Sequence, residues 1–171
     1  MIEKERFFMK MIVCVSENYG IGKGGELLFS LPPDMKLFRE TTMNSVVVMG
    51  RATLDSFPGG KPLKNRENIV LTRNKDFQRD GVVVANSEKD VLEKIKEYPD
   101  KEVYVIGGEE IYRMFEPYCS GAIVTKVQAR PDADKFFFNI DEAPGWRLSE
   151  ESEIMEHEGT KFCFCRYIKE D

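Results

Sequence analysis

Short apolar runs rich in β-branched residues recur along the whole chain, and polar or helix-like stretches separate them. Runs of this length are typical of strands that are buried in a sheet. They are MIVCV (11–15), VVVM (46–49), NIVLT (68–72), VVVA (82–85), VYVI (103–106), AIVTKV (122–127) and KFCFCRYI (161–168). The pattern shows no repeat, low-complexity tract or linker, which favours one domain.

Helical periodicity lies between these strands. The clearest helix begins at Ser87, where SEKD has the spacing of a capping box. Apolar residues then share one face, at Val91, Leu92, Ile95 and Tyr98. We expect further helices after Pro33, Gly50 and Gly108.

Alternating strands and helices predict right-handed crossovers, with ligands at the carboxyl ends of the strands. After Thr125 the helical periodicity stops, and loops containing Pro131, Pro144, Gly145 and Gly159 join the last strands. The predicted fold is therefore α/β: a single-domain, mixed, mostly parallel twisted sheet with helices on both faces and an antiparallel C-terminal edge.

Composition narrows the classes of function. The 171 residues hold 25 Lys and Arg against 30 Asp and Glu, a net charge of −5, which argues against a nucleic-acid or anionic-membrane surface. The longest apolar runs, such as 46–49 and 103–106, are far below the roughly 20 residues that span a bilayer. The start lacks the features of a signal peptide, so we expect a cytoplasmic protein.

Cysteine and histidine are few. Cys14, Cys119, Cys163 and Cys165 form no CxxC pair, and His157 is the only histidine. We therefore expect no metal site, and free, buried thiols rather than disulfides. Cys163 and Cys165 should point to the same face of a strand.

The segment GIGKGG (20–25) satisfies the dinucleotide pattern GxGxxG after a strand. That pattern requires a helix to begin at the glycines, whereas GELLFSLPP precedes the first helix here. We interpret the segment instead as a mobile loop that closes over a site.

Two other strand ends resemble phosphate cradles. VVVMGRAT turns at Gly50 into a helix, and VYVIGGEEIY turns at Gly107 and Gly108 into another. Unpaired N–H groups at helix starts attract anions, and glycine lets a phosphate approach. For either motif alone, glycines that simply end strands are the stronger explanation. A third strand end, LTR (71–73), adds Thr72 and Arg73 and favours a dinucleotide.

Asp34 is the most informative anomaly. In PPDMKLFRETT it shares one helix face with Leu37, Phe38 and Thr41, so an acid lies on the apolar stripe. It could merely complement the helix dipole. If Asp34 instead has a functional role, a carboxylate beside an apolar wall would bind a flat heterocycle bearing adjacent N–H and NH₂ donors.

GIGKGGELLFSLPPDMKLFRETT, VVVMGRAT, KPLKNRENIVLTR, VYVIGGEEIY, Thr125 and FCFCRY together resemble dihydrofolate reductase of the bacterial type. The resemblance implies a dihydrofolate-reductase-like domain over 9–171, preceded by an N-terminal extension over 1–8. It implies NADPH-dependent reduction of 7,8-dihydrofolate to 5,6,7,8-tetrahydrofolate, with hydride passing from nicotinamide C4 to pterin C6 and a water protonating N5. We expect a monomer.

The resemblance implies residue roles for the substrate. Asp34 would bind the pterin N3 and 2-amino group, supported by the hydroxyl of Thr125, and these two form the catalytic pair. Ile12 and Ile106 would contact the pterin through carbonyls. The remaining substrate residues are Phe38, which would pack on the ring, and Arg66, which would clamp the α-carboxylate of the glutamate tail.

For the cofactor, the resemblance implies that Cys14 and Ile21 hold the nicotinamide amide through their backbone. The other implied cofactor residues are Gly22, Gly50, Arg51, Ala52, Thr53, Leu71, Thr72, Arg73, Ile106, Gly107, Gly108, Glu109, Glu110, Ile111 and Tyr112. Arg51, Thr72 and Arg73 would meet the 2′-phosphate, which favours NADPH over NADH. The Gly107–Gly108 bond is cis in the family.

Some positions depart from the family. Phe29 stands where tryptophan is usual, Leu28 replaces a proline, and Glu110 replaces an arginine found in some bacterial members. The glycine-rich loop would close with Asp134 as its partner. Two alternatives stay open: a pyrimidine reductase of riboflavin synthesis, which needs no Asp34, Phe38 and Arg66 set, and a non-catalytic nucleotide-binding module.

Overall fold

The structure is a computed structural model that describes residues 9–170; residues 1–8, expected as an N-terminal extension, and residue 171 lie outside the described part. A nine-stranded sheet has the order β10-β12-β8-β1-β7-β4-β5-β6, and β11 pairs with β12. The parallel strands are β1 (Met9–Val15), β4 (Val46–Gly50), β5 (Glu67–Leu71), β6 (Val82–Ala85), β7 (Val103–Gly107) and β8 (Cys119–Val127). All seven apolar runs form strands, as predicted.

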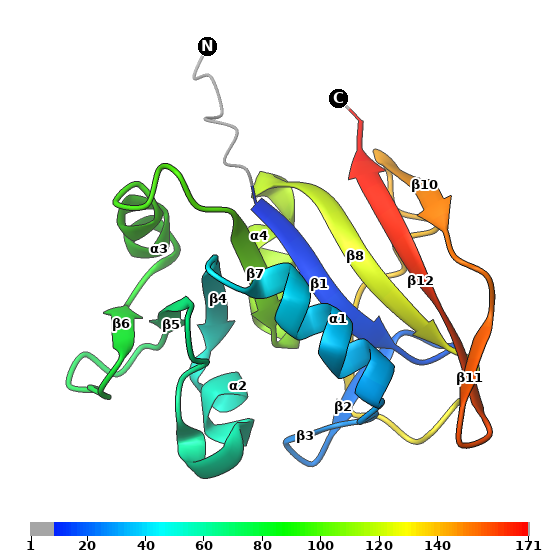
Figure 1. Ribbon diagram of the computed structural model, residues 1–171. Coiled ribbons are helices and arrows are strands. Elements are labelled where there is room, and N and C mark those ends of the chain that lie inside the picture. Colours follow the sequence, from blue (N-terminus) through cyan, green and yellow to red (C-terminus); the bar gives the residue numbers. More distant parts are fainter. Residues whose placement is uncertain (1–8, 171) are drawn as a thin grey trace.

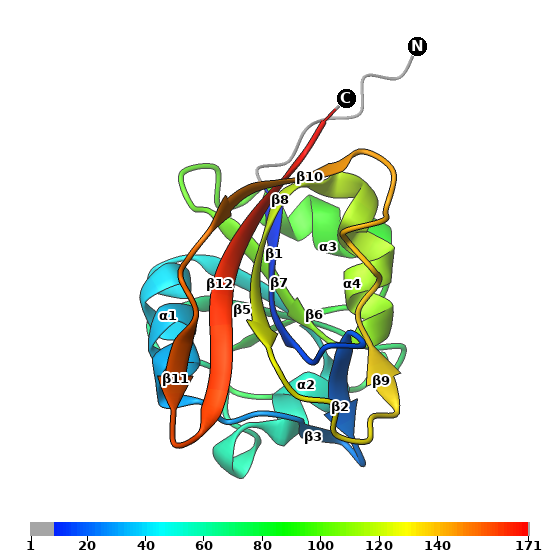
Figure 2. The same ribbon diagram turned by 90° about the vertical axis from the view of Figure 1, so that its right-hand side faces the viewer.

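The C-terminal edge is antiparallel, as predicted. It consists of β12 (Thr160–Lys169), β10 (Trp146–Glu151) and β11 (Met155–His157). Figure 2 shows β12 running beside β8 along this edge.

Helices cover both faces of the sheet, because each has one apolar face to bury. On one face, α1 (Pro32–Thr42) and α2 (Arg51–Ser56) pack over a core containing Ile12, Val47 and Ile106. On the other, α3 (Glu88–Ile95) and α4 (Glu109–Phe115) cover a larger core (Figures 1 and 2). Two 3₁₀ turns, η1 (Pro58–Gly60) and η2 (Glu116–Tyr118), follow α2 and α4.

The helix starts agree closely with the sequence. The side chain of Ser87 accepts a hydrogen bond of 3.0 Å from the amide of Asp90, the cap that the SEKD spacing predicts. Helix α1 begins at Pro32, one residue before the expected Pro33. Helix α3 ends at Ile95, so Tyr98 packs on the core from the turn that follows.

The glycine-rich segment differs from the expectation. It forms a hairpin of β2 (Gly20–Lys23) and β3 (Glu26–Leu27), and β9 (Lys135–Phe136) adds a third strand. Gly24 and Gly25, both with positive φ, make the turn. The prediction of a loop was wrong for these strands, because β2 pairs with β3 beside it and with β9, which is distant in sequence. No helix begins at the glycines, so the segment lacks the helix that a dinucleotide fingerprint requires, as expected.

Within residues 9–170, no helix is long and apolar enough to cross a membrane.

Candidate functional site

Asp34 lies in the first turn of α1, half-buried against the sheet. The hydroxyl of Thr125, on β8, donates a hydrogen bond of 2.6 Å to its Oδ1. Burial raises the pKa of Asp34 above its ordinary value, while hydrogen bonds from Thr125 and Cys14 oppose part of that rise. The carboxyl group is therefore easier to protonate than one in water.

An apolar wall lies on the face of the sheet that α1, the helix of Asp34, covers. Leu37 and Phe38 from α1 pack with the buried Ile12 of β1 and Ile106 of β7 in one core cluster. The buried hydroxyl of Tyr112, on α4, donates a hydrogen bond of 2.7 Å to the carbonyl of Ile12. Four substrate residues implied by the resemblance thus lie together on the face that α1 covers, although their roles stay predictions.

Cys14 contributes a contact that the sequence did not suggest. Its thiol interacts with the carboxylate of Asp34, and burial together with that carboxylate raises the thiol pKa. The signal was present in the strand pattern, because Cys14 alternates with Ile12 onto the same face. The register of β1 with β8 then pairs Cys14 with Thr125.

Arg66 lies at the end of the loop before β5 and is only partly exposed. Its guanidinium donates hydrogen bonds to the hydroxyl of Thr42 at 3.1 Å and to the carbonyl of Lys64 at 2.9 Å. Burial, and then the nearby charge of Arg39, lower the pKa of Arg66. Two positive charges thus lie near the C-terminal end of α1, an arrangement suited to a carboxylate ligand.

The three strand ends expected at the cofactor lie side by side, at the carboxyl ends of the neighbouring strands β7, β4 and β5. The register of β4 pairs Gly50 with Leu71 of β5 and Met49 with Gly107 of β7. The implied cofactor residues that lie there are Gly50, Arg51, Ala52, Thr53, Leu71, Thr72, Arg73, Ile106, Gly107, Gly108, Glu109, Glu110, Ile111 and Tyr112. The Gly107–Gly108 peptide is cis, as in the family.

Glycine is needed at these turns for reasons of space. A Cβ on Gly50 would meet the side chain of Ile111 at 3.2 Å, and one on Gly107 would meet the hydroxyl of Thr53 at 3.3 Å. Gly107 also has a φ of +133°. The two turns and Thr53 therefore form a narrow cradle lined by backbone and a hydroxyl.

The basic residues near these strand ends differ in their contacts: Arg51 and Arg79 contact other side chains, whereas Arg73 is exposed. The guanidinium of Arg51 stacks over the ring of Phe77 at 4.4 Å from its centre and lies 3.5 Å from Asp55. Arg79 reaches the same ring from 5.1 Å and pairs with Asp55 at 2.8 Å. Arg73 is exposed. Sequence reasoning missed Phe77 and Arg79, because no local pattern shows that they pack against α2.

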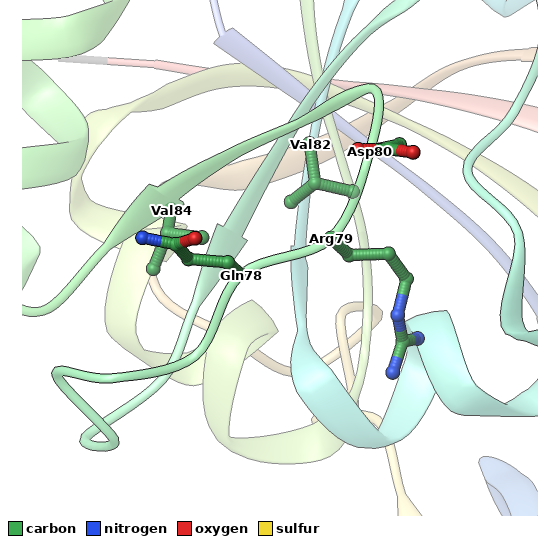
Figure 3. A pocket seen from close by; sticks show the side chains of 5 residues that line it. All are labelled: Gln78, Arg79, Asp80, Val82 and Val84. Carbon is green, nitrogen blue, oxygen red and sulfur yellow. The ribbon is translucent and has the colours of Figure 1, made fainter.

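Two surface hollows lie beside Arg79. One, of about 500 Å³, is lined by Gln78, Arg79, Asp80, Val82 and Val84 (Figure 3). The other, of about 470 Å³, is lined by Gly59, Gly60, Lys61, Pro62, Lys64, Arg79 and Asp80. Neither is lined by Asp34 or Thr125, so we do not assign the chemistry to them.

The hairpin is tied to the loop after β8. The carboxylate of Asp134 accepts a hydrogen bond of 3.0 Å from the amide of Gly24, the partner that we expected for this segment. The amide of Asp134 in turn donates to the carbonyl of Gly22. Ile21 is buried within β2, so this strand carries two of the implied cofactor residues, Ile21 and Gly22.

Two of the positions that depart from the family pattern, Phe29 and Glu110, differ in burial. Phe29 packs beside Leu31, Val127 and Phe162 in a small third core cluster. Glu109 accepts a hydrogen bond of 3.1 Å from the amide of Phe136, which joins α4 to β9, whereas Glu110 is exposed.

Comparison with known families identifies one match. The family profile described as "Dihydrofolate reductase" matches residues 8–169. The dihydrofolate reductase of Bacillus subtilis (strain 168) is 35% identical over 153 residues, which cover 90% of this chain and 85% of the relative.

Longer relatives match over part of their length. A bifunctional dihydrofolate reductase-thymidylate synthase of Daucus carota is 32% identical over 177 residues. The match covers 94% of this chain but 33% of that relative, so the chain spans about a third of it.

Among solved structures, the chain is similar to the dihydrofolate reductase from Enterococcus faecalis complexed with NADP(H) and RAB-propyl. The TM-score is 0.86 at 32% sequence identity, covering 96% of this chain and 99% of that one.

Proposed function

The chain belongs to the dihydrofolate reductase family, and on this premise we propose that it reduces 7,8-dihydrofolate to 5,6,7,8-tetrahydrofolate with NADPH. The observation that carries the proposal is the Asp34–Thr125 hydrogen bond of 2.6 Å, which fixes a carboxyl group beside an apolar wall. A nucleotide-binding module without catalysis would have no use for such a group. A pyrimidine reductase would not need the set of Asp34, Phe38 and Arg66 either.

The substrate would lie along the face that α1 covers. Asp34 would accept hydrogen bonds from N3–H and the 2-amino group of the pterin, a pair of donors that matches two carboxylate oxygens. Phe38 would pack on the ring, and the carbonyls of Ile12 and Ile106 would bind its edge. Arg66 would hold the α-carboxylate of the glutamate tail, and the neighbouring Arg39 supports an anion there.

The residues at the strand ends fit NADPH. The turns at Gly50 and Gly107 follow neighbouring strands, and glycine at both would let a pyrophosphate approach the backbone beside Thr53. Because α2 and α4 have six and seven residues, we assign the binding to local amides and hydroxyls rather than to a long helix dipole. Arg51, Thr72 and Arg73 would meet the 2′-phosphate, while Cys14 and Ile21 would hold the carboxamide.

NADPH, when bound, supplies the hydride for the substrate's C6. The chain's own residues would position the substrate, exclude bulk water and favour protonation of N5. Burial raises the pKa of Asp34, and its contact with the pterin would increase the basicity of N5. A water admitted near the β2–β3 hairpin would deliver the proton to N5.

The experiment that tests the function is loss of NADPH absorbance with dihydrofolate as the acceptor. A pyrimidine ribose phosphate acceptor serves as the comparison. Oxidation of NADPH with dihydrofolate alone supports the proposal. Oxidation with only the pyrimidine, or with neither acceptor despite NADPH binding, would assign the chain to one of the two alternatives.

We propose that the protein acts as a monomer in the cytoplasm and binds no nucleic acid. The net charge of −5 supports the last point, since nucleic-acid surfaces need clustered positive charge. Sedimentation across a range of concentrations tests the monomer.

A further inference from the structure

Three potential metal ligands meet on the face of the sheet opposite Asp34. Cys163 and Cys165 alternate along β12, and Glu151 of β10 lies directly across from Cys165 in the strand register. Their ligand atoms all lie within 4.8 Å of one another. Phe164, between the two cysteines, pairs with Thr125 and so faces the site side, which places the thiols on the other side.

The distances match those of a tetrahedral thiolate site. The two Sγ atoms are 3.8 Å apart, and Cys163 Sγ is 3.9 Å from Glu151 Oε1. Two sulfurs at about 2.3 Å from a tetrahedral zinc ion stand about 3.8 Å apart, and a sulfur and a carboxylate oxygen stand about 3.5 Å apart. The thiols therefore already have the required spacing, and the exposed Glu151 needs only a small rotation.

A disulfide is a poorer fit for the same two cysteines. Their Cβ atoms, two residues apart along an extended strand, are about 6.6 Å apart, whereas a disulfide requires about 3.5–4.5 Å. Backbone hydrogen bonds hold the strand in place, since β12 pairs with β8 on one side and with β10 on the other. The geometry therefore favours a bridging cation over a sulfur–sulfur bond.

The type of ligand in this cluster favours a thiophilic cation, and among the described residues no unpaired positive charge opposes it within the cluster. The nearby ammonium of Lys126 is neutralised by Asp141 at 2.7 Å. Thiolates are soft ligands that select zinc or cadmium over magnesium or calcium.

We propose that Cys163, Cys165 and Glu151 form a binding site for zinc or a similar thiophilic divalent ion, with water as the fourth ligand. The sequence-based expectation of no metal site rested on the absence of a CxxC pair. It did not consider a CxC pair that is completed by a neighbouring strand. Binding would release the two thiol protons to solvent and would join β10 to β12.

Metal titration of the intact chain under a phosphine reductant tests the site. Zinc affinity is measured by competition with a chromophoric chelator, and cadmium by its thiolate charge-transfer absorption. We expect one ion per chain, and no cadmium–thiolate absorption in Cys163→Ser. Glu151→Gln should bind zinc at least about tenfold more weakly, because it loses a charged ligand.

Two matched variants serve as controls. Glu150→Gln changes the adjacent exposed acid, which points to the other face of β10, and Cys119→Ser removes a buried thiol at the far end of β8. Both should bind like the wild type. The proposal is contradicted if the wild type binds no ion or if Cys163→Ser retains wild-type zinc affinity. It is also contradicted if Glu151→Gln and Glu150→Gln have the same zinc affinity, or if Cys119→Ser abolishes binding. Circular dichroism of each variant checks its fold.

Discussion

Thr125 donates a hydrogen bond of 2.6 Å to Asp34 across 91 residues of sequence. The bond joins the first turn of α1 to the C-terminal part of β8, so it fixes the helix and its carboxyl group on one face of the sheet. Removing either partner should therefore alter the chemistry of the site more than the fold.

Asp34→Asn keeps the shape of the side chain and removes its charge. We expect turnover to drop by roughly 100-fold or more, the scale of a lost proton-transfer role. NADPH affinity should stay nearly constant, because Asp34 faces the substrate. Single-turnover hydride transfer in the wild type should fall as pH rises through an apparent pKa above about 3.9, and the variant should lose this dependence. Wild-type rates in the variant would show that Asp34 only complements the dipole of helix α1.

The same substitution should stabilise the ligand-free protein at neutral pH. Because the folded-state pKa of Asp34 is raised, its ionised form costs stability above that pKa, and the cost disappears as pH falls below the unfolded value. Asp34→Asn should therefore have a higher Tm than the wild type at pH 8, with a smaller difference near pH 3. Thermal unfolding at the two pH values checks the sign, and an equal difference at both would contradict it.

Thr125→Val tests the hydroxyl itself. Loss of a donor to the carboxylate should raise the pKa of Asp34 further, so the pH profile of hydride transfer should shift to higher pH. Thr125→Ser retains the hydroxyl and should keep the wild-type profile. A profile that shifts equally in both variants would attribute the effect to packing.

Arg66→Ala should raise the KM for dihydrofolate at least roughly tenfold, because a charge-assisted hydrogen bond contributes about 1.5–3 kcal/mol. Arg66→Lys should recover only part of this, since an ammonium cannot form the same two parallel bonds. Arg130→Ala, a change at an exposed arginine on another loop, is the control. An unchanged KM in Arg66→Ala removes the clamp assignment.

Reversal of the charges of Arg51 and Arg73 should abolish most of the preference for NADPH over NADH. Salt should weaken NADPH binding more than NADH binding in the wild type, because Arg73 is exposed and its attraction is screened. The ratio of kcat/KM for the two cofactors measures the preference. Equal use of both cofactors by the wild type would refute the assignment.

Asp141 should contribute stability that depends on pH. Burial raises its pKa, but hydrogen bonds from Lys126, Tyr167 and Tyr19 outweigh this and leave it lower than usual. The contribution is present above the unfolded pKa and is lost as pH falls through the folded one. Urea unfolding should find Asp141→Asn less stable than the wild type by about 1 kcal/mol at pH 7. The two should converge at low pH; a constant gap would show that the charge is not responsible.

The order of the strands and helices could be predicted from the sequence, because apolar periodicity and caps are local signals. The runs at 11–15 and 46–49 could be assigned as strands without knowledge of their partners, and Ser87 as a cap from its own tetrapeptide. Asp34 was detectable for the same reason, since an acid on an apolar stripe is visible within one helix.

Contacts between distant segments were not predictable in this way. The hairpin at 20–27 depends on β9, more than a hundred residues later, and composition alone indicated only a loop. The meeting of Arg51, Phe77 and Arg79 depends on how α2 packs against the loop before β6.

The sequence by itself therefore determined the strands formed by the seven apolar runs, most helices, the family resemblance and the identity of the acid. Only the tertiary structure decided which groups surround that acid and which thiols have a carboxylate beside them. The register of β1 with β8 pairs Cys14 with Thr125, the residue that binds Asp34, and the register of β10 with β12 brings Glu151 to the two thiols. Register follows from the burial of whole strand faces, because a shift by one residue would turn every side chain to the opposite face.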